Sequence, residues 1–536
     1  MIEPDILIVG AGFAGLYMLH SARKLGLSAR VIEAGQDVGG TWYWNRYPGA
    51  RCDVESFSYS YSFSEELQQD WTWSHRYATQ PEILSYARHV ADRFDLRKDI
   101  SFGMRVTSAT WNEERLRWQV ETDKGQSFAA RFLVMATGCL SVPKVPDLPH
   151  LEDFRGQVLH TAKWPEQGVD FTGRKVGLVG TGSSAIQSIP IIAREAGHLT
   201  VFQRTANFSV PAWNAPVSPA QDRDVKQNYK ALRAKGRATH AGDIADEGYV
   251  AILGLDEKAR EAAFETCWAQ GGFSFQYAYS DLMVSEEANR LAADFVRRKI
   301  RETVRDPKTA ERLCPRDHPL GSKRLCVDTD YYETYNRPNV SLVDLRDEPI
   351  ERFTPGGLKT SAGQHDFDTL VLATGFDAMT GALTAFDIRG ANGMQLRDAW
   401  AGGPAAYLGI AVAGFPNFFV ITGPGSPSVL ASVLLAIEQH VEWLSGLLNH
   451  AQTNGIMRIE ADRAAQAGWT KRVAKGAEKT LFTKGNSWYL GSNVPGKPRV
   501  FMPFADGFCV YEKICNDIAA EGYSGFHLAR DLEIAR

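Results

Sequence analysis

Two glycine-rich turns in this chain have the spacing of loops that bind the phosphates of a dinucleotide. Residues 10–15 read GAGFAG, a complete GxGxxG, and residues 180–185 read GTGSSA, a GxGxxA. In such loops the first glycine makes a tight turn, the second admits a pyrophosphate, and the third position lets the helix pack closely on the strand. The free N–H groups at the start of the helix then face the phosphates. The predicted cofactor-binding residues here are Gly10, Gly12, Phe13, Ala14, Gly15, Gly180, Thr181, Gly182, Ser183 and Ser184.

The residue that would read the adenosine ribose differs between the two sites. Glu33 ends the strand after the first turn, where a carboxylate accepts hydrogen bonds from ribose hydroxyls, which favours FAD or NAD. The corresponding position after the second turn carries Arg204, followed by Thr205, and a guanidinium can bind a 2′-phosphate. We therefore predict FAD in the first site and NADP in the second, with hydride transfer from NADPH to the flavin. The alternative for Arg204 is an exposed cation at a strand end.

The apolar pattern supplies the elements that these turns require. Short apolar runs predict buried strands, and the longer stretches after each turn predict helices. The predicted strands are 6–9, 29–32, 175–179 and 199–203, and the predicted helices are 16–25 and 185–196. The fold class predicted from this pattern is α/β, with two Rossmann-like dinucleotide-binding domains, one for FAD and one for NADP.

The predicted domains alternate along the chain. We assign residues 1–140 to the first part of the FAD-binding domain, 141–376 to the NADP-binding domain, and 377–536 to the second part of the FAD-binding domain. Between about 212 and 320 charged residues and alanines become frequent and apolar residues recur at helical spacing, which predicts a helical insertion in the NADP-binding domain.

Other stretches carry weaker signals. Two runs, 133–138 and 370–375, read as strands that end in Ala-Thr-Gly, where the chain could cross between domains or make an ordinary turn. Residues 407–425 predict two buried strands, residues 429–449 predict a long helix, and the tail from Trp488 onwards predicts irregular structure.

The composition excludes several kinds of protein. The 536 residues suit two or three domains, and a net charge of -4 gives no basic field for nucleic acid or an acidic membrane. No uninterrupted apolar stretch reaches the roughly 18 residues of a membrane-spanning helix. The seven cysteines form no CxxC pair, which favours reduced thiols over disulfides or a metal site. No signal-peptide pattern is seen at the start, so we expect a cytoplasmic protein. We also expect no bound metal, and a monomer.

Two longer motifs indicate which family of nucleotide-binding proteins the chain resembles. The first is FxGxxxHxxxWP, formed by Phe154, Gly156, His160, Trp164 and Pro165. The second is GGxWxxxx[YF]PGxxxD, formed by Gly39, Gly40, Trp42, Tyr47, Pro48, Gly49 and Asp53. With these motifs the whole chain resembles the type I Baeyer–Villiger monooxygenases of the class B flavin monooxygenases, and is similar to the phenylacetone and cyclohexanone enzymes among them.

The resemblance implies a reaction in which NADPH reduces FAD, O2 gives a C4a-peroxyflavin, and the peroxide converts a ketone into an ester or lactone while NADP+ stays bound. It assigns Arg324 as the cation that stabilises the peroxide and the adduct, with Asp53 as its ion-pair partner. Lys323 would bind the 2′-phosphate with Arg204 and Thr205. In the C-terminal part, residues 485–489 and 493–497 resemble the family's mobile lid segment that closes over bound NADP, and Trp488 would be its contact with the nicotinamide end. The flavin-binding residues implied outside the first turn are Gly40, Thr41, Trp42, Asp53, Tyr59 and Val106.

Several alternatives stay open at this stage. His160 could be a general base, although nothing adjacent activates it and a hydrogen-bonding role between domains is favoured. The same flavin chemistry could oxygenate sulfur or nitrogen, and a flavin or disulfide reductase would need a cysteine pair that the sequence lacks. Asp506 stands where close relatives usually have small residues, and it could change the polarity of the pocket or the docking of the lid.

Overall fold

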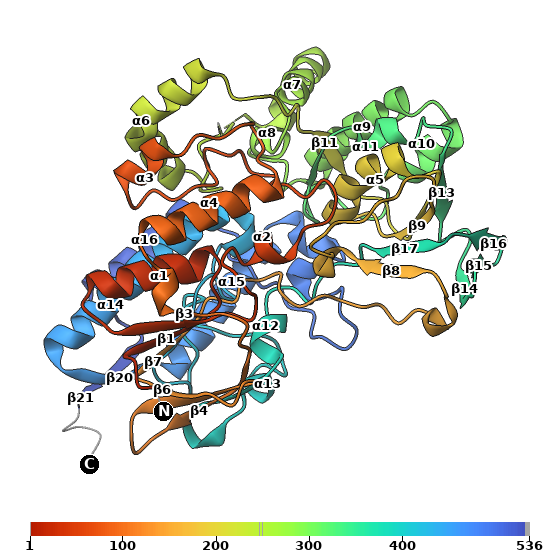
Figure 1. Ribbon diagram of the computed structural model, residues 1–536. Helices are drawn as coiled ribbons and strands as arrows, with labels where there is room; N and C mark the ends of the chain where they lie inside the picture. The colour runs from red at the N-terminus through yellow and green to blue at the C-terminus, as the bar shows by residue number, and fades with distance from the viewer. Residues whose placement is uncertain (1, 246, 249, 531–536) are drawn as a thin grey trace.

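Two parallel five-stranded sheets form the body of the protein (Figure 1). The computed structural model describes residues 2–245, 247–248 and 250–530. The first sheet has the order β19-β7-β1-β2-β3, with bounds Phe418–Val420, Phe132–Met135, Ile6–Val9, Ala29–Ile32 and Ile100–Ser101. The second has the order β13-β10-β9-β17-β8, with bounds Val340–Asp344, His198–Gln203, Lys175–Val179, Thr369–Leu372 and Gln157–His160. The predicted α/β class, with two Rossmann-like units, is confirmed.

Helices cover these sheets, which explains why several of their strands are buried along their whole length. Every residue of β1, β7 and β17 is buried, as expected for parallel strands with both faces packed. The helices that follow the two glycine turns are α1 (Phe13–Lys24) and α5 (Ser183–Glu195). The other helices outside the insertion are α2 (Thr41–Trp44), α3 (Glu65–Asp70), α4 (Gln80–Arg93), α11 (Tyr331–Thr334), α12 (Gly381–Thr384), α13 (Leu396–Ala399), α14 (Val433–Asn454), α15 (Arg463–Glu478) and α16 (Phe508–Ala520).

A run of helices follows the third strand of the second unit and lies along the top of Figure 1. Its members are α6 (Pro219–Ala238), α7 (Glu257–Gln270), α8 (Ser274–Tyr277), α9 (Glu286–Thr303) and α10 (Pro307–Leu313). Arg237 on α6 makes ion pairs with Glu442 on α14, at 2.9 Å, and with Glu512 on α16. The helical run is therefore tied to the part of the chain that completes the first unit.

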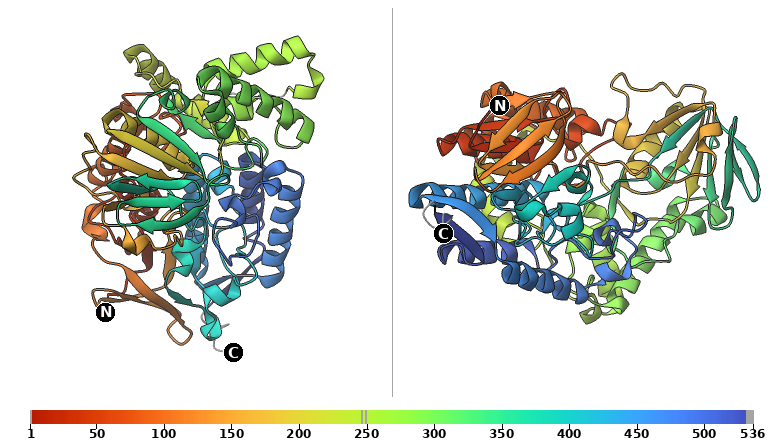
Figure 2. Two further views of the ribbon diagram at one scale, coloured as in Figure 1. Left: turned by 90° about the vertical axis from the view of Figure 1, so that its right-hand side faces the viewer. Right: turned by 90° about the horizontal axis from the view of Figure 1, so that it is seen from below.

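Four smaller sheets complete the structure, and in the right-hand view of Figure 2 the three-stranded one lies at the right-hand margin. One has the order β18-β4-β5-β6, with bounds Asp387–Arg389, Val106–Asn112, Arg117–Thr122 and Ser127–Ala130. The second is β14-β15-β16, with bounds Ile350–Thr354, Gly357–Thr360 and Gly363–Asp366. The last two are the pairs β11-β12, with bounds Ser209–Pro211 and Cys326–Asp328, and β20-β21, with bounds Ile456–Ala461 and Phe526–Arg530.

The structure corrects two predictions about the C-terminal half. Residues 407–425 contain one strand, β19, because Gly409 and Gly414 adopt left-handed φ angles of 71° and 88° and turn the chain before it. The tail after Trp488 is not irregular throughout, since α16 and β21 lie within it. Phe508, Tyr511 and Cys515 are buried along one face of α16, a helical spacing that the surrounding glycines and prolines obscured.

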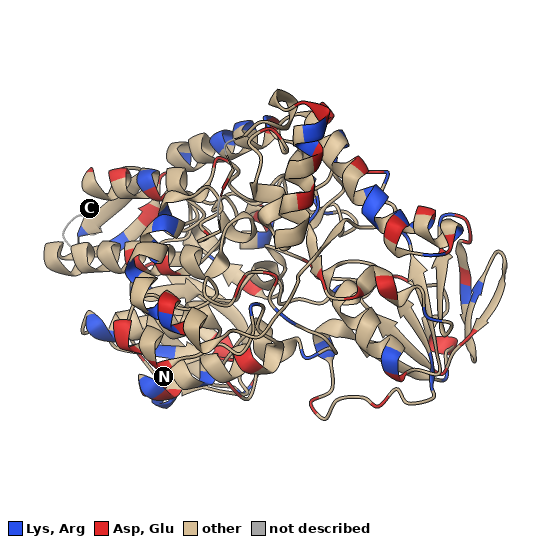
Figure 3. Cartoon of the chain, turned by 90° about the horizontal axis from the view of Figure 1, so that it is seen from above, with Lys and Arg blue, Asp and Glu red and all other residues tan. Residues whose placement is uncertain are grey.

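The surface carries both signs of charge in alternation. Figure 3 shows Lys and Arg interspersed with Asp and Glu along the outer helices, in keeping with the small net charge. Among the residues that the structure describes, no helix is long and apolar enough to cross a membrane.

Candidate active site

The first glycine turn forms a surface made of backbone alone. Gly10 has φ +104°, and a Cβ there would lie 2.7 Å from the carbonyl oxygen of Ala136. A Cβ on Gly15 would lie 1.9 Å from the oxygen of Gly10, and one on Gly40 would lie 2.8 Å from the Cα of Gly12. Side chains would fill this cradle, which sits at the start of α1. It fits the pyrophosphate of a dinucleotide such as FAD.

Glu33 is fixed beside this cradle. Its carboxylate accepts hydrogen bonds from the N–H of Ala11 at 2.7 Å and of Gly35 at 2.6 Å. Burial raises the pKa of Glu33, although the two backbone hydrogen bonds act in the opposite direction. An ionised carboxylate has about four lone-pair positions, so it can also accept hydrogen bonds from ribose hydroxyls.

The other predicted flavin-binding residues lie around the same turn. Trp42 donates its indole N–H to the hydroxyl of Tyr59 at 2.9 Å, and the Tyr59 ring centroid is 5.8 Å from that of Phe13. Thr41 is exposed at the start of α2, directly after Gly40. Val106 is buried at the start of β4, whose preceding chain is bonded to the backbone of Glu33.

The second glycine turn repeats this geometry. Gly180 has φ +123°, and a Cβ there would lie 2.4 Å from the oxygen of Ala373, whereas the space above Gly182 is open. Thr181 donates its hydroxyl to the carbonyl oxygen of Thr205 at 2.6 Å, which joins the turn to the residues after β10. Ser183 and Ser184 form the first turn of α5. The site again fits a dinucleotide pyrophosphate.

Two cations border this second site. Arg204 is exposed directly after β10, and Lys323 is partly buried before β12. Burial lowers the pKa of Lys323, and the charge of Arg204 lowers it further. Within the described part of the chain, neither residue has a carboxylate ion-pair partner, so both are available to an anion such as a 2′-phosphate.

Arg324 and Asp53 form a two-pronged ion pair. The Nε and Nη2 groups of Arg324 donate to the two carboxylate oxygens of Asp53 at 2.9 and 2.8 Å, and Nη1 donates to the carbonyl oxygen of Val429 at 2.8 Å. Burial acts to lower the pKa of Arg324, but the charge of Asp53 and its hydrogen bonds outweigh burial and raise the pKa well above its usual range. The guanidinium is a permanent cation that still keeps 22% of its side-chain surface exposed.

Aromatic side chains from two distant segments surround this pair. The Arg324 guanidinium lies 4.6 Å from the ring centroid of Phe273, which precedes α8 in the insertion. The hydroxyls of Tyr277 and Tyr489 lie close enough to Arg324 to raise its pKa further. Burial raises the pKa of Tyr489 to about 12. Sequence reasoning did not assign Phe273 or Tyr277, because nothing in their spacing connects the insertion to Arg324.

The segment 47–53 carries the chain from the first site to the second. Tyr47 donates its hydroxyl to the side-chain oxygen of Gln187 on α5 at 2.9 Å, and Gln187 donates its amide to the carbonyl oxygen of Arg51 at 3.1 Å. A Cβ on Gly49 would lie 2.2 Å from the backbone oxygen of Gln187, so only glycine permits this approach. The segment ends at Asp53, which therefore meets Arg324 at the junction of the two sites.

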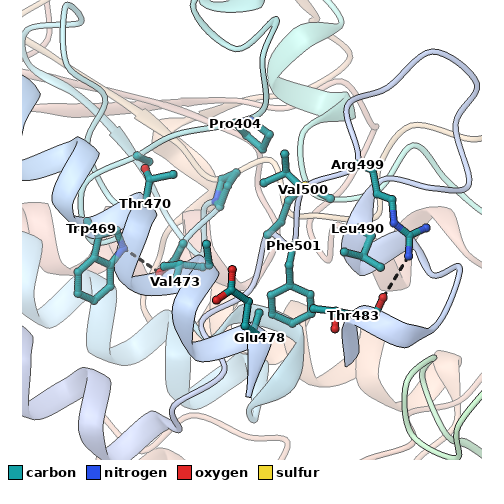
Figure 4. Close-up of a pocket in the computed structure, with 16 residues that line it drawn as sticks. Pro404, Trp469, Thr470, Val473, Glu478, Thr483, Leu490, Arg499, Val500 and Phe501 are labelled. Carbon is teal, nitrogen blue, oxygen red and sulfur yellow. Dashed lines mark hydrogen bonds between the residues drawn. The ribbon is translucent and has the colours of Figure 1, made fainter. Parts of the chain in front are cut away.

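Residues 485–497, the predicted lid segment, pack against the same region. Trp488 is half-buried, and its ring centroid lies 4.5 Å from that of Tyr489. Residues 488–490 form a short helical turn, and Leu490 at its end lines a pocket of about 310 Å³ together with Phe501 and α15 (Figure 4). Arg499 borders the pocket and donates to the carbonyl oxygen of Thr483 at 3.1 Å. The turn at 488–490 therefore separates this pocket from the Arg324 pair.

The structure shows the surroundings of His160 and Asp506, whose roles the sequence did not decide. His160 accepts a hydrogen bond from the N–H of Ala162 through Nδ1, and its Nε2 faces the carbonyl oxygen of Lys144 at 3.2 Å. Burial lowers the pKa of His160, so the ring serves as a neutral connector between chain segments. Asp506 faces α15, where its Oδ2 lies 4.0 Å from Nε of Arg472.

Comparisons with known proteins place this geometry in context. A family model described as pyridine nucleotide-disulphide oxidoreductase matches residues 7–289. A Baeyer–Villiger monooxygenase of Pseudooceanicola batsensis is 41% identical over 98% of this chain and 96% of its own length. A phenazine N-monooxygenase of Lysobacter antibioticus is also 41% identical, over 98% of this chain and 97% of its own length.

Solved structures agree over nearly the whole chain. An oxidised steroid monooxygenase bound to NADP has 50% identity and a TM-score of 0.95, covering 98% of this chain and 100% of its own. The protein OTEMO in complex with FAD and NADP has 40% identity and a TM-score of 0.95, covering 98% of this chain and 99% of its own. Both cofactors predicted from the glycine turns thus occur in a structure of this architecture.

Proposed function

Because the chain belongs to the Baeyer–Villiger monooxygenases, we propose that it converts a ketone into an ester or lactone with NADPH and O2. The cofactors of this enzyme are FAD and NADP, as in the structures that it matches. The observation that carries the proposal is the ion pair of Arg324 and Asp53, placed where the chain passes from one dinucleotide site to the other.

The site residues act by binding and by fixed charge. When bound, FAD supplies the ring that activates oxygen, and NADPH supplies two electrons. Arg324 presents a cation that does not give up its proton, so it stabilises negative charge beside it throughout the reaction. Of the five N–H groups of its guanidinium, three are engaged by Asp53 and Val429. The other two are shared between the Tyr489 hydroxyl and the reacting oxygen atoms.

Asp53 keeps this cation in one orientation, and aromatic side chains cover part of it. Removing one partner of a mostly buried ion pair leaves an uncompensated charge, so Asp53 has a positioning role. Phe273, Tyr277 and Tyr489 shield part of the guanidinium from water, which strengthens its field. Glu33 and the pair Arg204 and Lys323 hold the adenosine ends of the two cofactors.

The test is product analysis with purified holoenzyme, NADPH and O2. Cyclic, aromatic and long-chain ketones are compared with sulfides and aromatic amines, and esters or lactones are identified by gas chromatography and mass spectrometry. Ester or lactone formation as the fastest reaction supports the proposal. NADPH consumption that yields only hydrogen peroxide with every compound would refute it.

Nitrogen oxygenation is the second candidate, because a relative as similar as the Baeyer–Villiger enzyme is named as a phenazine N-monooxygenase. A faster reaction with an aromatic N-heterocycle than with any ketone would favour it. A disulfide reductase is not supported, since all seven cysteines are free thiols and none forms a pair. Reduced thiols suit the cytoplasm, where we place the enzyme as a monomer. Size-exclusion chromatography with light scattering tests the monomer.

A further inference from the structure

Three basic side chains lie around the carboxyl edge of the second sheet. Two of them, Arg204 and Lys323, are assigned to the 2′-phosphate, and the third, Lys144, is not yet assigned to a ligand. Arg204 follows β10, Lys323 precedes β12, and Lys144 lies over the ends of β8 and β17. Burial and then the charge of Arg204 lower the pKa of Lys144. Burial also lowers the pKa of Lys323, where the charge of Asp317 acts to raise it and that of Arg204 to lower it. Within the described residues none of the three has a carboxylate ion-pair partner. The nearest carboxylate that acts on them, Asp317 beside Lys323, is paired with His318 at 2.7 Å, so the three cations together can hold an anion.

The backbone of Lys144 is held rigidly in this position. Its N–H donates to the carbonyl oxygen of Gly375 at 2.9 Å, and its own carbonyl oxygen accepts from the hydroxyl of Thr374 at 2.7 Å. The same oxygen faces Nε2 of His160 at 3.2 Å. Because β8 and β17 both end here, the Cα of Lys144 is tied to the sheet that carries the second dinucleotide site.

The side chain of Lys144 reaches a different part of the chain. Its ammonium group donates a hydrogen bond to the carbonyl oxygen of Asn493 in the lid segment. Asn493 in turn donates its side-chain amide to the carbonyl oxygen of Phe376 at 2.7 Å, and Lys497 pairs with Asp377 at 2.5 Å. The lid segment thus rests on both chain crossings between the domains, and Lys144 is the contact that also belongs to the cation cluster.

We propose that Lys144 is a third cationic ligand of the cofactor's 2′-phosphate, and that its hydrogen bond to Asn493 links occupation of that phosphate site to the docked position of the lid segment. An ammonium has three N–H groups, so one can stay on Asn493 while the others bind phosphate oxygens. The phosphate would draw Lys144 into a fixed position, and the lid segment would be held with it. The proposal depends on NADP as the cofactor and not on the identity of the oxygenated substrate.

The first test measures binding without turnover. NADP+ and NAD+, which differ only in the 2′-phosphate, are titrated by calorimetry into the oxidised FAD holoenzyme of the wild type, Lys144→Gln and Lys144→Arg. We expect Lys144→Gln to weaken NADP+ binding about tenfold, as for a lost hydrogen bond to a charged group, and to leave NAD+ binding unchanged. Lys144→Arg should restore most of the affinity. Lys175→Gln is the matched control, because Lys175 is exposed at the opposite edge of the same sheet, at the start of β9.

The second test follows the lid segment by hydrogen–deuterium exchange of peptides covering residues 485–497, with each nucleotide at saturation. In the wild type, NADP+ should slow exchange more than NAD+ does, and Lys144→Gln should abolish that difference. Equal loss of affinity for NADP+ and NAD+ in Lys144→Gln would overturn the phosphate contact. An unchanged difference in exchange would overturn the link to the lid. Neither result depends on whether a ketone is the substrate.

Discussion

Replacing Arg324 by alanine removes the cation that the structure places between the two dinucleotide sites. Asp53 and Val429 engage three of its five N–H groups, and the other two are shared between the Tyr489 hydroxyl and the reacting oxygens. Loss of a single preorganised donor of this kind costs about 10² to 10³ in rate, or roughly 2.7–4 kcal/mol. Because Arg324→Ala removes a full charge together with its donors, we expect ester formation to fall by at least about 10³-fold.

The assay must separate this loss from a failure to bind or reduce the flavin. Arg324→Ala should bind FAD, and NADPH should bleach the flavin absorbance at close to the wild-type rate, since Glu33 and the glycine turns do not contact Arg324. Ester yield is then measured by gas chromatography together with hydrogen peroxide release, which should replace it. Arg324→Lys, which keeps the charge but cannot form the two-pronged pair, is the matched variant and should retain only slight activity. An ester rate within tenfold of wild type in Arg324→Ala would refute the assigned role.

Three further predictions concern Asp53, Arg204 and Asp328. Asp53→Asn should lower the ester rate about 10- to 100-fold, less than Arg324→Ala, because the cation stays but its orientation is lost; an unchanged rate would contradict this. Arg204→Ala should raise the KM for NADPH about tenfold and leave that for NADH nearly unchanged; equal effects would remove Arg204 from the 2′-phosphate site. Burial raises the pKa of Asp328 to about 7, so the folded state keeps a proton that the unfolded chain loses, and stability falls as pH rises from about 4 to about 7. Asp328→Asn should therefore show a smaller fall in Tm between pH 5 and pH 8, and a fall as large as that of the wild type would argue against this titration.

The strands that appear in the sequence as short apolar runs could be predicted. The strands 6–9, 29–32 and 175–179 coincide with β1, β2 and β9, because a buried parallel strand is a continuous apolar run bounded by glycine. The helix α16 was missed, since its buried face alternates with polar residues in a region rich in glycine and proline. Local composition dominated that prediction, whereas packing against α14 stabilises the helix in the folded protein.

The candidate site was predictable only where a motif marks it. Glu33 and Arg204 follow their glycine turns at a fixed interval, so their positions could be derived from strand length. Phe273 and Tyr277 come from an insertion whose path across the molecule no periodicity reveals. The contact of Lys144 with Asn493 joins residues 349 positions apart, and long-range contacts of this kind depend on how the domains dock rather than on local pattern.

The ion pair of Arg324 and Asp53 joins residues 271 positions apart, one from each dinucleotide-binding unit. Neither unit contains both charges, so an isolated fragment or an exchange of one unit with a relative would leave a buried charge facing a foreign surface. A functional chimera must therefore carry residues 47–53 together with the helix α5 that Tyr47 and Gly49 contact, even though they belong to different units. Hybrid enzymes made from this chain should therefore keep these contacts between the two units intact, and their exchange points should not be chosen from the ends of the two sheets alone.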